Sequence, residues 1–312
     1  MKKNSRKDQI KGFLALIGAA TILSFYGLTI RLQSESFTSY GQLFFRTAIA
    51  LILILIIIAV KRNWKVPRSE RKWLIAFGVG NTIYPFLFTI SVLNINASNS
   101  VMMLYVGGII AAFLIGSVFL REKITKLKLI GALLAFIGLA VFAFPFDIRG
   151  AALVGIGAGL TAGVFDAISN ALRKYITETP REVMLAISFG TLVVIVGSVI
   201  SLTSVQAVES SPVQVPSYIA MIVHSVCIIA GGYLLIYGFR HFDVNAGTIV
   251  LSSEIFISLA VNYFVLSESP SVNEVIGALI IFSASGAIAL SVAEKSRASS
   301  LHRKYSRQKI TI

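Results

Sequence analysis

The sequence predicts an all-α integral membrane protein with ten transmembrane helices, built as two inverted-topology repeats of five helices. Composition supports the membrane assignment, because 56% of the 312 residues are hydrophobic and only 13% are charged. Soluble domains carry about 25% charged residues. The few polar residues here lie in short stretches between long apolar runs, so they cannot cover a surface exposed to water. The spacing of these runs and an internal repeat support the rest of the prediction.

Each predicted helix is an apolar run of about 20 residues, the length needed to cross the hydrocarbon core of a bilayer. The ten runs cover 12–32, 40–60, 72–93, 97–120, 127–145, 150–173, 183–204, 217–238, 245–267 and 273–293. The first run lacks a small-residue cleavage site, since Tyr26 and Arg31 stand where one would be expected. We therefore expect it to stay in the protein rather than to be removed as a signal peptide.

Positive charge predicts the orientation of these helices. Of the 28 Lys and Arg residues, 25 fall in the termini and in the connections on one side, the opposite side holds only Arg31 and Arg149, and Arg46 lies inside the second run. Basic loops face the cytoplasm. We therefore expect a multi-pass protein of the cell inner (plasma) membrane with both termini cytoplasmic. The segments 1–11 and 294–312 are then basic cytoplasmic extensions.

The net charge of +14 fits this topology and contact with anionic membrane lipids, and we expect no nucleic acid partner. Cys227 is the only cysteine, which excludes disulfides within the chain and cysteine-based metal sites. The three histidines, His224, His241 and His302, are dispersed, and no Gly-rich phosphate loop of the Walker type occurs. We expect no metal, no cofactor and no catalytic residues, because the loops are too short and plain for an enzyme active site.

An internal repeat relates the fourth and fifth predicted helices to the ninth and tenth at a constant offset of 146 residues. The matches are Asn99 with Asn245, Ile109 with Ile255, Leu120 with Leu266, Glu122 with Glu268, Ile130-Gly131-Ala132-Leu133 with Ile276-Gly277-Ala278-Leu279, and Phe136 with Phe282. A repeat of five helices has odd parity, so the second copy must be inverted. This predicts repeats at 12–146 and 147–293. Inverted repeats with a binding site near the midplane are typical of secondary transporters.

At these residues the chain resembles the EamA-type members of the drug/metabolite transporter superfamily, over roughly residues 11–293. The shared marks are the 23-residue spacing from Asn99 to Glu122 and from Asn245 to Glu268, the Ile-Gly-Ala-Leu eight residues after each Glu, and Arg46 early in the second helix. A proline that is common in the fourth and ninth helices of the family is absent, and Gly107-Gly108 and Glu254 stand there instead. The resemblance implies a secondary carrier, often an exporter of amino acids, related metabolites or toxic compounds.

Ionisable side chains inside the predicted helices are candidates for substrate binding or coupling, because such a charge costs about 2.5–3.5 kcal/mol on insertion scales. Glu254 lies near the middle of the ninth helix and shares a face with Gly247, Ser258 and Asn262. Its carboxyl either pairs with another helix, or stays protonated in apolar surroundings, or binds and releases a proton as a carrier alternates. The last alternative is a hypothesis of proton coupling.

Asp166 is the candidate acidic residue of the sixth helix, where it shares a face with Ser169, Asn170 and Arg173. This face either bounds a polar vestibule or marks a helix end whose side chains reach the membrane surface. The same helix carries three glycines at intervals of four, for which we predict close packing against another helix. They are Gly155, Gly159 and Gly163.

Arg46 lies about 9 Å along the second helix, where it either binds an anionic group of a substrate or pairs with Glu254 or Glu35. His224 lies inside the eighth helix, and a lone histidine there either bonds to another helix or transfers protons. The remaining candidates are polar or aromatic side chains that offer amides, hydroxyls or ring faces to a substrate, although aromatic residues near helix ends are often interface anchors. They are Asn81, Tyr84, Tyr105 and Tyr233.

Weak points in the helical backbone are candidate gating hinges. Pro85 removes a hydrogen bond from the third helix and favours a kink, and at the offset of 146 its partner is Gly231, followed by Gly232. Gly107 and Gly108 are a further candidate pair. Close packing of helices is the alternative explanation for these glycines.

These observations predict a secondary active transporter of small molecules that works by alternating access. Residues of both charge signs, together with aromatic rings, suit an amphipathic metabolite such as an amino acid, and protons are a candidate coupling ion. The alternative is a passive channel or lipid scramblase, because polar stripes and inverted repeats occur there too. Export is implied only by the family resemblance.

Overall fold

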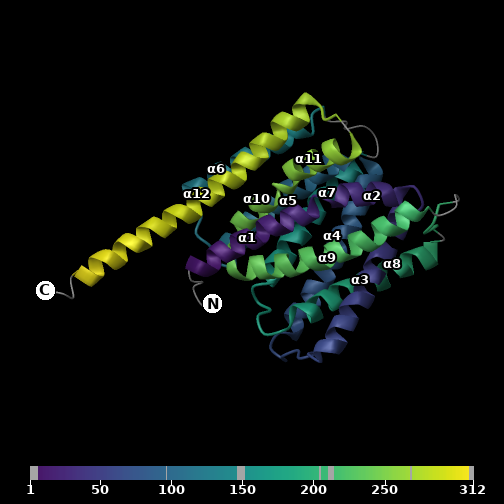
Figure 1. Cartoon of the computed structure of the whole chain (residues 1–312), viewed down its shortest axis with the longest axis horizontal. Coiled ribbons are helices and arrows are strands. Elements are labelled where there is room, and N and C mark those ends of the chain that lie inside the picture. The colour runs from purple at the N-terminus through teal and green to yellow at the C-terminus, as the bar shows by residue number, and fades with distance from the viewer. Residues whose placement is uncertain are drawn as a thin grey trace.

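The computed structural model describes residues 6–95, 97–145, 152–203, 205–209, 214–267 and 269–308, except for the side chains of residues 6, 97, 98, 266 and 291–308. Within these ranges the chain is helical, and its one β-bridge pairs Phe37 with Val208. The helices are α1 (Arg6–Leu23), α2 (Tyr26–Ser34), α3 (Ser39–Lys61), α4 (Arg71–Asn94), α5 (Ala97–Val118), α6 (Lys126–Phe142), α7 (Ala152–Leu172), α8 (Arg181–Thr203), α9 (Val215–His241), α10 (Val244–Leu251), α11 (Glu254–Leu266) and α12 (Val272–Gln308). They form one bundle, beyond which the last turns of α12 project (Figure 1).

The described helices confirm that the protein is built from membrane-spanning segments. Nine helical stretches of the described residues are long and apolar enough to cross a bilayer, with α1 and α2 together forming one and α10 and α11 another. The predicted fifth segment corresponds to α6, which has 17 residues and lies outside this set. Many apolar side chains on the outside of the bundle are exposed, such as Leu114 and Leu133 at 60% each, as expected of a surface that faces lipid rather than water.

Two of the ten predicted helices are interrupted, which the sequence analysis did not predict. The first ends at Leu23 and resumes at Tyr26, and the ninth ends at Leu251 and resumes at Glu254. At the second interruption, the hydroxyls of Ser252 and Ser253 donate to the main-chain oxygens of Ile249 and Val250 at 2.7 and 2.6 Å. Serine hydroxyls that bond to the preceding turn compete with the helical backbone. Glu254 therefore begins a new helix, on the far side of the interruption from Gly247.

The glycines of α7 provide close helix contacts, as their spacing predicts. A Cβ atom added at Gly163 would lie 2.1 Å from the main-chain oxygen of Leu104 on α5, and one at Gly159 would lie 2.7 Å from Met103. Gly155 packs in the same way against Ile95, just after α4. The backbone of α7 thus approaches its neighbours so closely that no side chain fits between them.

Helices α6 and α12 lie side by side along one edge of the bundle (Figure 1). Gly131 of α6 lies against Ile288 of α12, and Gly277 of α12 lies against Phe142 of α6. Adding 146 to Gly131 gives Gly277, and subtracting 146 from Ile288 gives Phe142. The two contacts are therefore equivalent under the offset of 146, because each joins the glycine of one helix to the same position of the other helix. A local two-fold axis between two antiparallel helices produces such a pair of contacts.

Four connections gather at one end of the bundle, which we call the basic end: those that follow α3, α5, α7 and α9, namely 62–70, 119–125, 173–180 and 242–243. At the opposite end, the segment after α2 is tied to the segment after α8. Thr38 donates to the main-chain oxygen of Gln206 at 2.7 Å, and Glu209 donates its amide to the main-chain oxygen of Ser36 at 3.0 Å.

Candidate functional site

Side chains from six helices meet in what we call the interior polar cluster. Tyr84 of α4 connects its members, because its phenol interacts electrostatically with Asp166, Glu254 and Arg46. The cluster consists of Tyr26 on α2, Arg46 on α3, Tyr84 on α4, Tyr105 on α5, Asp166 on α7 and Glu254 on α11. All but the buried Tyr105 keep part of their surface accessible. The fold thus brings together Arg46, Tyr84, Tyr105, Asp166 and Glu254, which the sequence analysis selected separately.

Tyr105 joins α5 to the interruption between α10 and α11. Its hydroxyl donates to the main-chain oxygen of Leu251 at 3.2 Å, and the phenol also interacts electrostatically with the Glu254 carboxyl. The interruption releases backbone groups from the helical hydrogen-bond ladder, and a phenol is one of the partners that restore such bonds in a membrane interior. Tyr105 is therefore both a support for the broken helix and a neighbour of the cluster's central carboxyl.

Arg46 lies among aromatic side chains rather than against a carboxylate. Its guanidinium interacts electrostatically with Tyr26 and Tyr84. Among the described residues it forms no ion pair, either with Glu254 or with the exposed Glu35. The structural pairing considered from the sequence is therefore not formed among the described residues, and binding of an anionic group stays a prediction.

Asp166 belongs to a chain of polar side chains along the last two turns of α7. Asn170 donates from Nδ2 to Asp166 Oδ2 at 2.9 Å and accepts a hydrogen bond from Arg173. Asn170 and Arg173 are buried, at 0% and 4% exposure. The face predicted from the sequence thus points into the protein, and the alternative of a helix end reaching for the membrane surface is wrong.

His224 of α9 is a buried partner of α2. Its Nδ1 lies 2.7 Å from the hydroxyl of Thr29, and its ring lies 4.3 Å from the ring of Tyr26. Its Nε2 has no hydrogen-bond partner among the described residues. The contacts fit the helix-to-helix hydrogen bond considered from the sequence, and Tyr26 places the histidine beside the interior polar cluster.

The remaining candidates differ in their distance from the cluster. Ser258 and Asn262 follow Glu254 at one-turn intervals on α11 and are partly buried, and Asn81 precedes Tyr84 by three residues on α4. Tyr233 instead interacts with Glu182 at the start of α8. The structure therefore brings Tyr233 to the basic end and not to the cluster.

The candidate hinges lie in helices that run without interruption. Pro85 lies inside α4, and Gly107 and Gly108 lie inside α5. A Cβ added at Gly107 would lie 2.2 Å from the main-chain oxygen of Leu160, and one at Gly232 would lie 2.6 Å from Leu185. Close packing accounts for these two glycines, and their role as hinges stays a prediction, as does that of Gly231.

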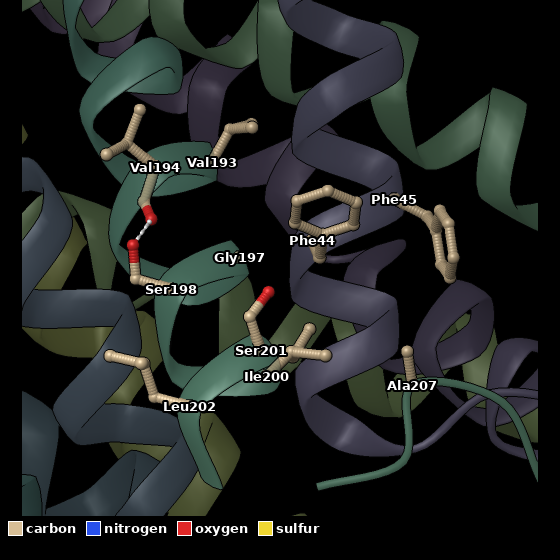
Figure 2. A pocket seen from close by; sticks show the side chains of 10 residues that line it. All are labelled: Phe44, Phe45, Val193, Val194, Gly197, Ser198, Ile200, Ser201, Leu202 and Ala207. Carbon is tan, nitrogen blue, oxygen red and sulfur yellow. Dashed lines mark hydrogen bonds between the residues drawn. The ribbon is translucent and has the colours of Figure 1, made fainter. Parts of the chain in front are cut away.

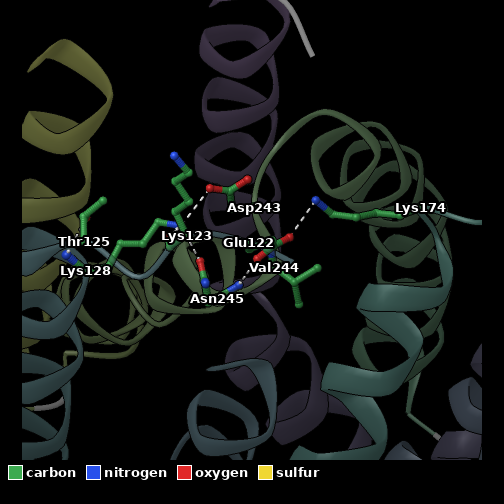
Figure 3. Close-up of polar contacts among 8 residues, drawn as sticks. All are labelled: Glu122, Lys123, Thr125, Lys128, Lys174, Asp243, Val244 and Asn245. Carbon is green, nitrogen blue, oxygen red and sulfur yellow. Dashed lines mark hydrogen bonds and ion pairs between the residues drawn. The ribbon is translucent and has the colours of Figure 1, made fainter. Parts of the chain in front are cut away.

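A second polar site, which the sequence analysis missed, joins four segments of the basic end (Figure 3). Glu122 accepts the amides of Val244 and Asn245 at the start of α10, at 2.9 and 3.2 Å, and pairs with Lys174 at 2.8 Å. Both side chains of this ion pair are buried, at 5% and 6% exposure. A carboxylate at a helix N-terminus satisfies free amides and the helix dipole together.

Lys128 completes this site from α6. Its ammonium donates to Asp243 and Asn245 at 2.7 Å each, and to the main-chain oxygen of Lys123 at 2.9 Å. These three acceptors match the three N–H groups of an ammonium. We call the set of Glu122, Lys128, Lys174, Asp243 and Asn245 the basic-end network. It connects the segment after α5, the end of α7 and the start of α10.

Glu70, before α4, holds the connection between α7 and α8. Its carboxylate accepts the amides of Thr177, Glu178 and Thr179 at 2.6–2.8 Å, and the hydroxyls of Thr177 and Thr179. Burial opposes ionisation of this carboxyl, but the hydrogen bonds outweigh burial and hold the pKa of Glu70 below its ordinary value of 4.5. The basic end is therefore closed by polar contacts on two sides of α7.

One pocket of the described surface, with a volume of about 680 Å³, lies between α3 and α8. Figure 2 shows the ring of Phe44 opposite α8, where it packs on Gly197, with Ser198, Ser201 and Ala207 along the wall. Its lining is mostly apolar and contains no member of the interior polar cluster. Between helices that face lipid, an apolar groove of this kind is suited to an acyl chain more than to a polar solute.

Comparison with known proteins finds a family similarity for the first half of the chain. Residues 10–144 match the EamA-like transporter family. This part of the chain is similar to EamA-like transporters. The match covers α1 to α6 and so includes Arg46, Tyr84, Tyr105 and Glu122, and it confirms the resemblance found in the sequence.

Structural similarity extends the comparison to nearly the whole chain. One solved structure, described as a crystal structure of protein, superposes with a TM-score of 0.76 over 92% of this chain and 99% of its own, at 15% identity. Identity this low establishes a shared fold only. No curated protein matches the sequence. The comparisons therefore show a fold shared over most of the chain and a similarity to EamA-like transporters over residues 10–144.

Proposed function

We propose that this EamA-like protein is a secondary active transporter that moves small metabolites, such as amino acids, by alternating access. The interior polar cluster carries the proposal. It places Arg46, Asp166 and Glu254 inside helices that cross the bilayer, where charged groups are costly and usually serve transport. Both signs of charge and three phenols suit an amphipathic solute with an amino and a carboxyl group.

The arrangement of the helices supports inverted repeats at 12–146 and 147–293. The α6–α12 contact is symmetric under the offset of 146, as described above. The hydrogen bond from Tyr105 to Leu251 joins residues that are themselves 146 positions apart. Equivalent residues of two repeats can touch only near the axis that relates them, so Tyr105 and Leu251 would lie close to that axis. Glu268, one mark of the repeat, lies outside the described residues.

Glu254 is the residue we assign to proton coupling. Its carboxyl follows the interruption of the ninth segment, interacts with Tyr105 and Asp166, and retains some accessible surface. In a carrier of this kind the carboxyl would bind a proton from one side and release it to the other. Asp166 is a second acidic group that interacts electrostatically with this carboxyl.

The basic end is the cytoplasmic end in this proposal, because positive charge marks the cytoplasmic face. The basic-end network and the contacts of Glu70 would then close the pathway to the cytoplasm. Export is the direction implied by resemblance to other EamA-type carriers.

Counterflow in proteoliposomes tests the proposal. The wild type and Glu254→Gln would be assayed against a pool of amino acids and metabolites, with and without a pH gradient. Glu35→Gln, which changes an exposed glutamate, is the control. Saturable exchange whose pH-driven part is lost only in Glu254→Gln supports a proton-coupled carrier. A leak that does not saturate, or lipid movement without solute exchange, would assign the protein to the channels or scramblases.

A further inference from the structure

Arg173 directly follows the last residue of α7 and ends the chain of polar side chains that begins at Asp166. It is a buried cation that lies close to two aromatic rings. Only 4% of the residue is exposed. Its guanidinium lies 5.5 Å from the ring centroid of Phe77 on α4 and 5.7 Å from that of Phe239 on α9. Cations are attracted to the faces of aromatic rings, but this attraction is weaker than that of a carboxylate.

Among the described residues, no carboxylate contacts this cation directly. Arg173 forms no ion pair there, its Nη1 donates to Asn170, and its Nε has no hydrogen-bond partner. Asn170 stands between it and Asp166, since the Asn170 amide donates to the acid and its oxygen accepts from the arginine. A buried charge is costly unless it is paired. The charge of Arg173 is therefore compensated only indirectly, by Asp166 across Asn170, and its Nε has no partner among the described residues.

Arg173 is continuous with the interior polar cluster. It interacts electrostatically with Asp166 and with Tyr84, and Tyr84 also interacts with Arg46. The phenol of Tyr84 thus interacts electrostatically with two cations, Arg46 on α3 and Arg173 just after α7. The next residue, Lys174, is held by Glu122 of the basic-end network. Opening this network would move the turn that carries both residues.

We propose that Arg173 binds the carboxylate of the transported solute on the cytoplasmic half of the pathway, after the contact between Lys174 and Glu122 has opened. This inference rests on the proposed carrier function and deepens it, because it assigns a carboxylate as the group recognised on that side. A guanidinium presents a planar pair of N–H donors that matches a carboxylate. Asn170 holds this fork in place while the rings of Phe77 and Phe239 keep it from water.

Sided transport measurements test the role of Arg173. Inside-out and right-side-out membrane vesicles containing the full chain would be assayed with each of the common L-amino acids. Every amino acid that is transported would then be compared with its carboxamide, which has the same side chain without the carboxylate. The variants are Arg173→Gln, Arg173→Lys and, as a control, Arg71→Gln, which changes an exposed arginine at the same end of the bundle.

We expect Arg173→Gln to raise the KM for the amino acid at the cytoplasmic face about tenfold or more, as expected for loss of a charge-assisted contact. The KM for the carboxamide and the KM at the opposite face should change less than twofold. Arg71→Gln should leave all of these values unchanged. Arg173→Lys keeps a cation without the planar fork, so its KM for the amino acid should rise about threefold.

Several results would overturn the inference. An amino-acid KM that is the same in the wild type and in Arg173→Gln, or that rises equally at both faces, would do so while the carrier function stands. If Arg173→Gln does not fold, an unchanged amino-acid KM in Arg173→Lys has the same meaning. A wild type that transports no member of the panel in either orientation would overturn the proposed function, and this inference with it.

Discussion

The hydroxyl of Tyr105 donates a hydrogen bond of 3.2 Å to the main-chain oxygen of Leu251, a residue 146 positions further along the sequence. The bond joins α5 to the last residue of α10, where the ninth segment is interrupted. Because the same phenol interacts with Glu254, the first residue of α11, it contacts both sides of the interruption. The geometry of the candidate coupling carboxyl therefore depends on a side chain from the other half of the chain.

Tyr105→Phe should lower the rate of transport several-fold while it lowers the free energy of unfolding only slightly. The change removes one hydroxyl and keeps the ring, so a loss of about 0.5–1.5 kcal/mol of unfolding free energy is expected for one hydrogen bond. Counterflow should fall several-fold, because the Glu254 carboxyl loses a partner. Tyr263→Phe is the control, since Tyr263 lies on α11 but is 50% exposed. Equal transport by the two variants would exclude a role for the Tyr105 hydroxyl.

Glu122→Gln should destabilise the closed basic end. Removing one member of a buried ion pair leaves the other charge uncompensated, at a cost of about 3–5 kcal/mol. The measurement is a double-mutant cycle of Glu122→Gln and Lys174→Met, read by thermal unfolding in detergent. We expect the double variant to be more stable than the sum of the single losses predicts. Additive losses would mean that the two side chains are not coupled.

Glu70→Gln should reduce stability at neutral pH but not in acid. The hydrogen bonds lower the pKa of Glu70 below 4.5 in the folded protein, so the folded state favours the ionised form. This stabilisation is present above pH 4.5 and is lost as the pH falls through the lowered pKa. We expect Glu70→Gln to cost about 1–3 kcal/mol at pH 7 and to approach the wild type once the pH falls below the lowered pKa of Glu70. Glu178→Gln, in the loop that Glu70 holds, changes an exposed carboxyl and is the control.

Gly163→Ala should strongly destabilise the protein, because its new Cβ would lie 2.1 Å from the main-chain oxygen of Leu104. Relief requires α5 and α7 to separate, and overpacking of this kind costs about 1–3 kcal/mol or more. Gly157→Ala, on the same helix, meets nothing within 4 Å and should be neutral or stabilising by up to about 1 kcal/mol. Thermal unfolding of the pair distinguishes close packing from a general intolerance of α7 to alanine.

The sequence predicted the helices well because the signals for them are local. A run of about 20 apolar residues must cross the bilayer, whatever its neighbours are. The interruption at Ser252 and Ser253 could not be predicted in this way, because two serines in an apolar run also occur in unbroken helices. What distinguishes them here is a phenol from α5 that satisfies the carbonyl of Leu251.

The candidate site was predictable only as a set of separate residues. Charge inside an apolar run identified Arg46, Asp166 and Glu254, but their shared neighbour, Tyr84, follows from the packing of four helices. Tyr233 was selected by the same aromatic signal, yet the turn of α9 directs it to Glu182. Periodicity within one helix cannot tell which neighbour covers which face.

The basic-end network had a signal in the sequence that went unused. Glu122 and Asn245 were both marks of the internal repeat, and in the fold the main-chain amide of Asn245 donates to the carboxylate of Glu122. An acidic repeat mark after one helix and a repeat mark at the start of another are candidates for such a contact, because the free amides of a helix N-terminus bind carboxylates. Lys128 and Lys174 were counted only as positive charge, although each is buried against an acid.

The seam between α6 and α12 constrains how the protein can move. At Gly138 and Gly277 the two backbones touch without intervening side chains, since a Cβ on either glycine would lie 2.6–2.8 Å from the main-chain oxygen of the other. If the distance between the two helices changed, no side chain at this contact could compensate for it by changing its rotamer. We expect this pair of helices to stay fixed relative to each other during transport. The segments around Tyr84 and Glu254 would then move relative to this pair as access changes from one face of the membrane to the other.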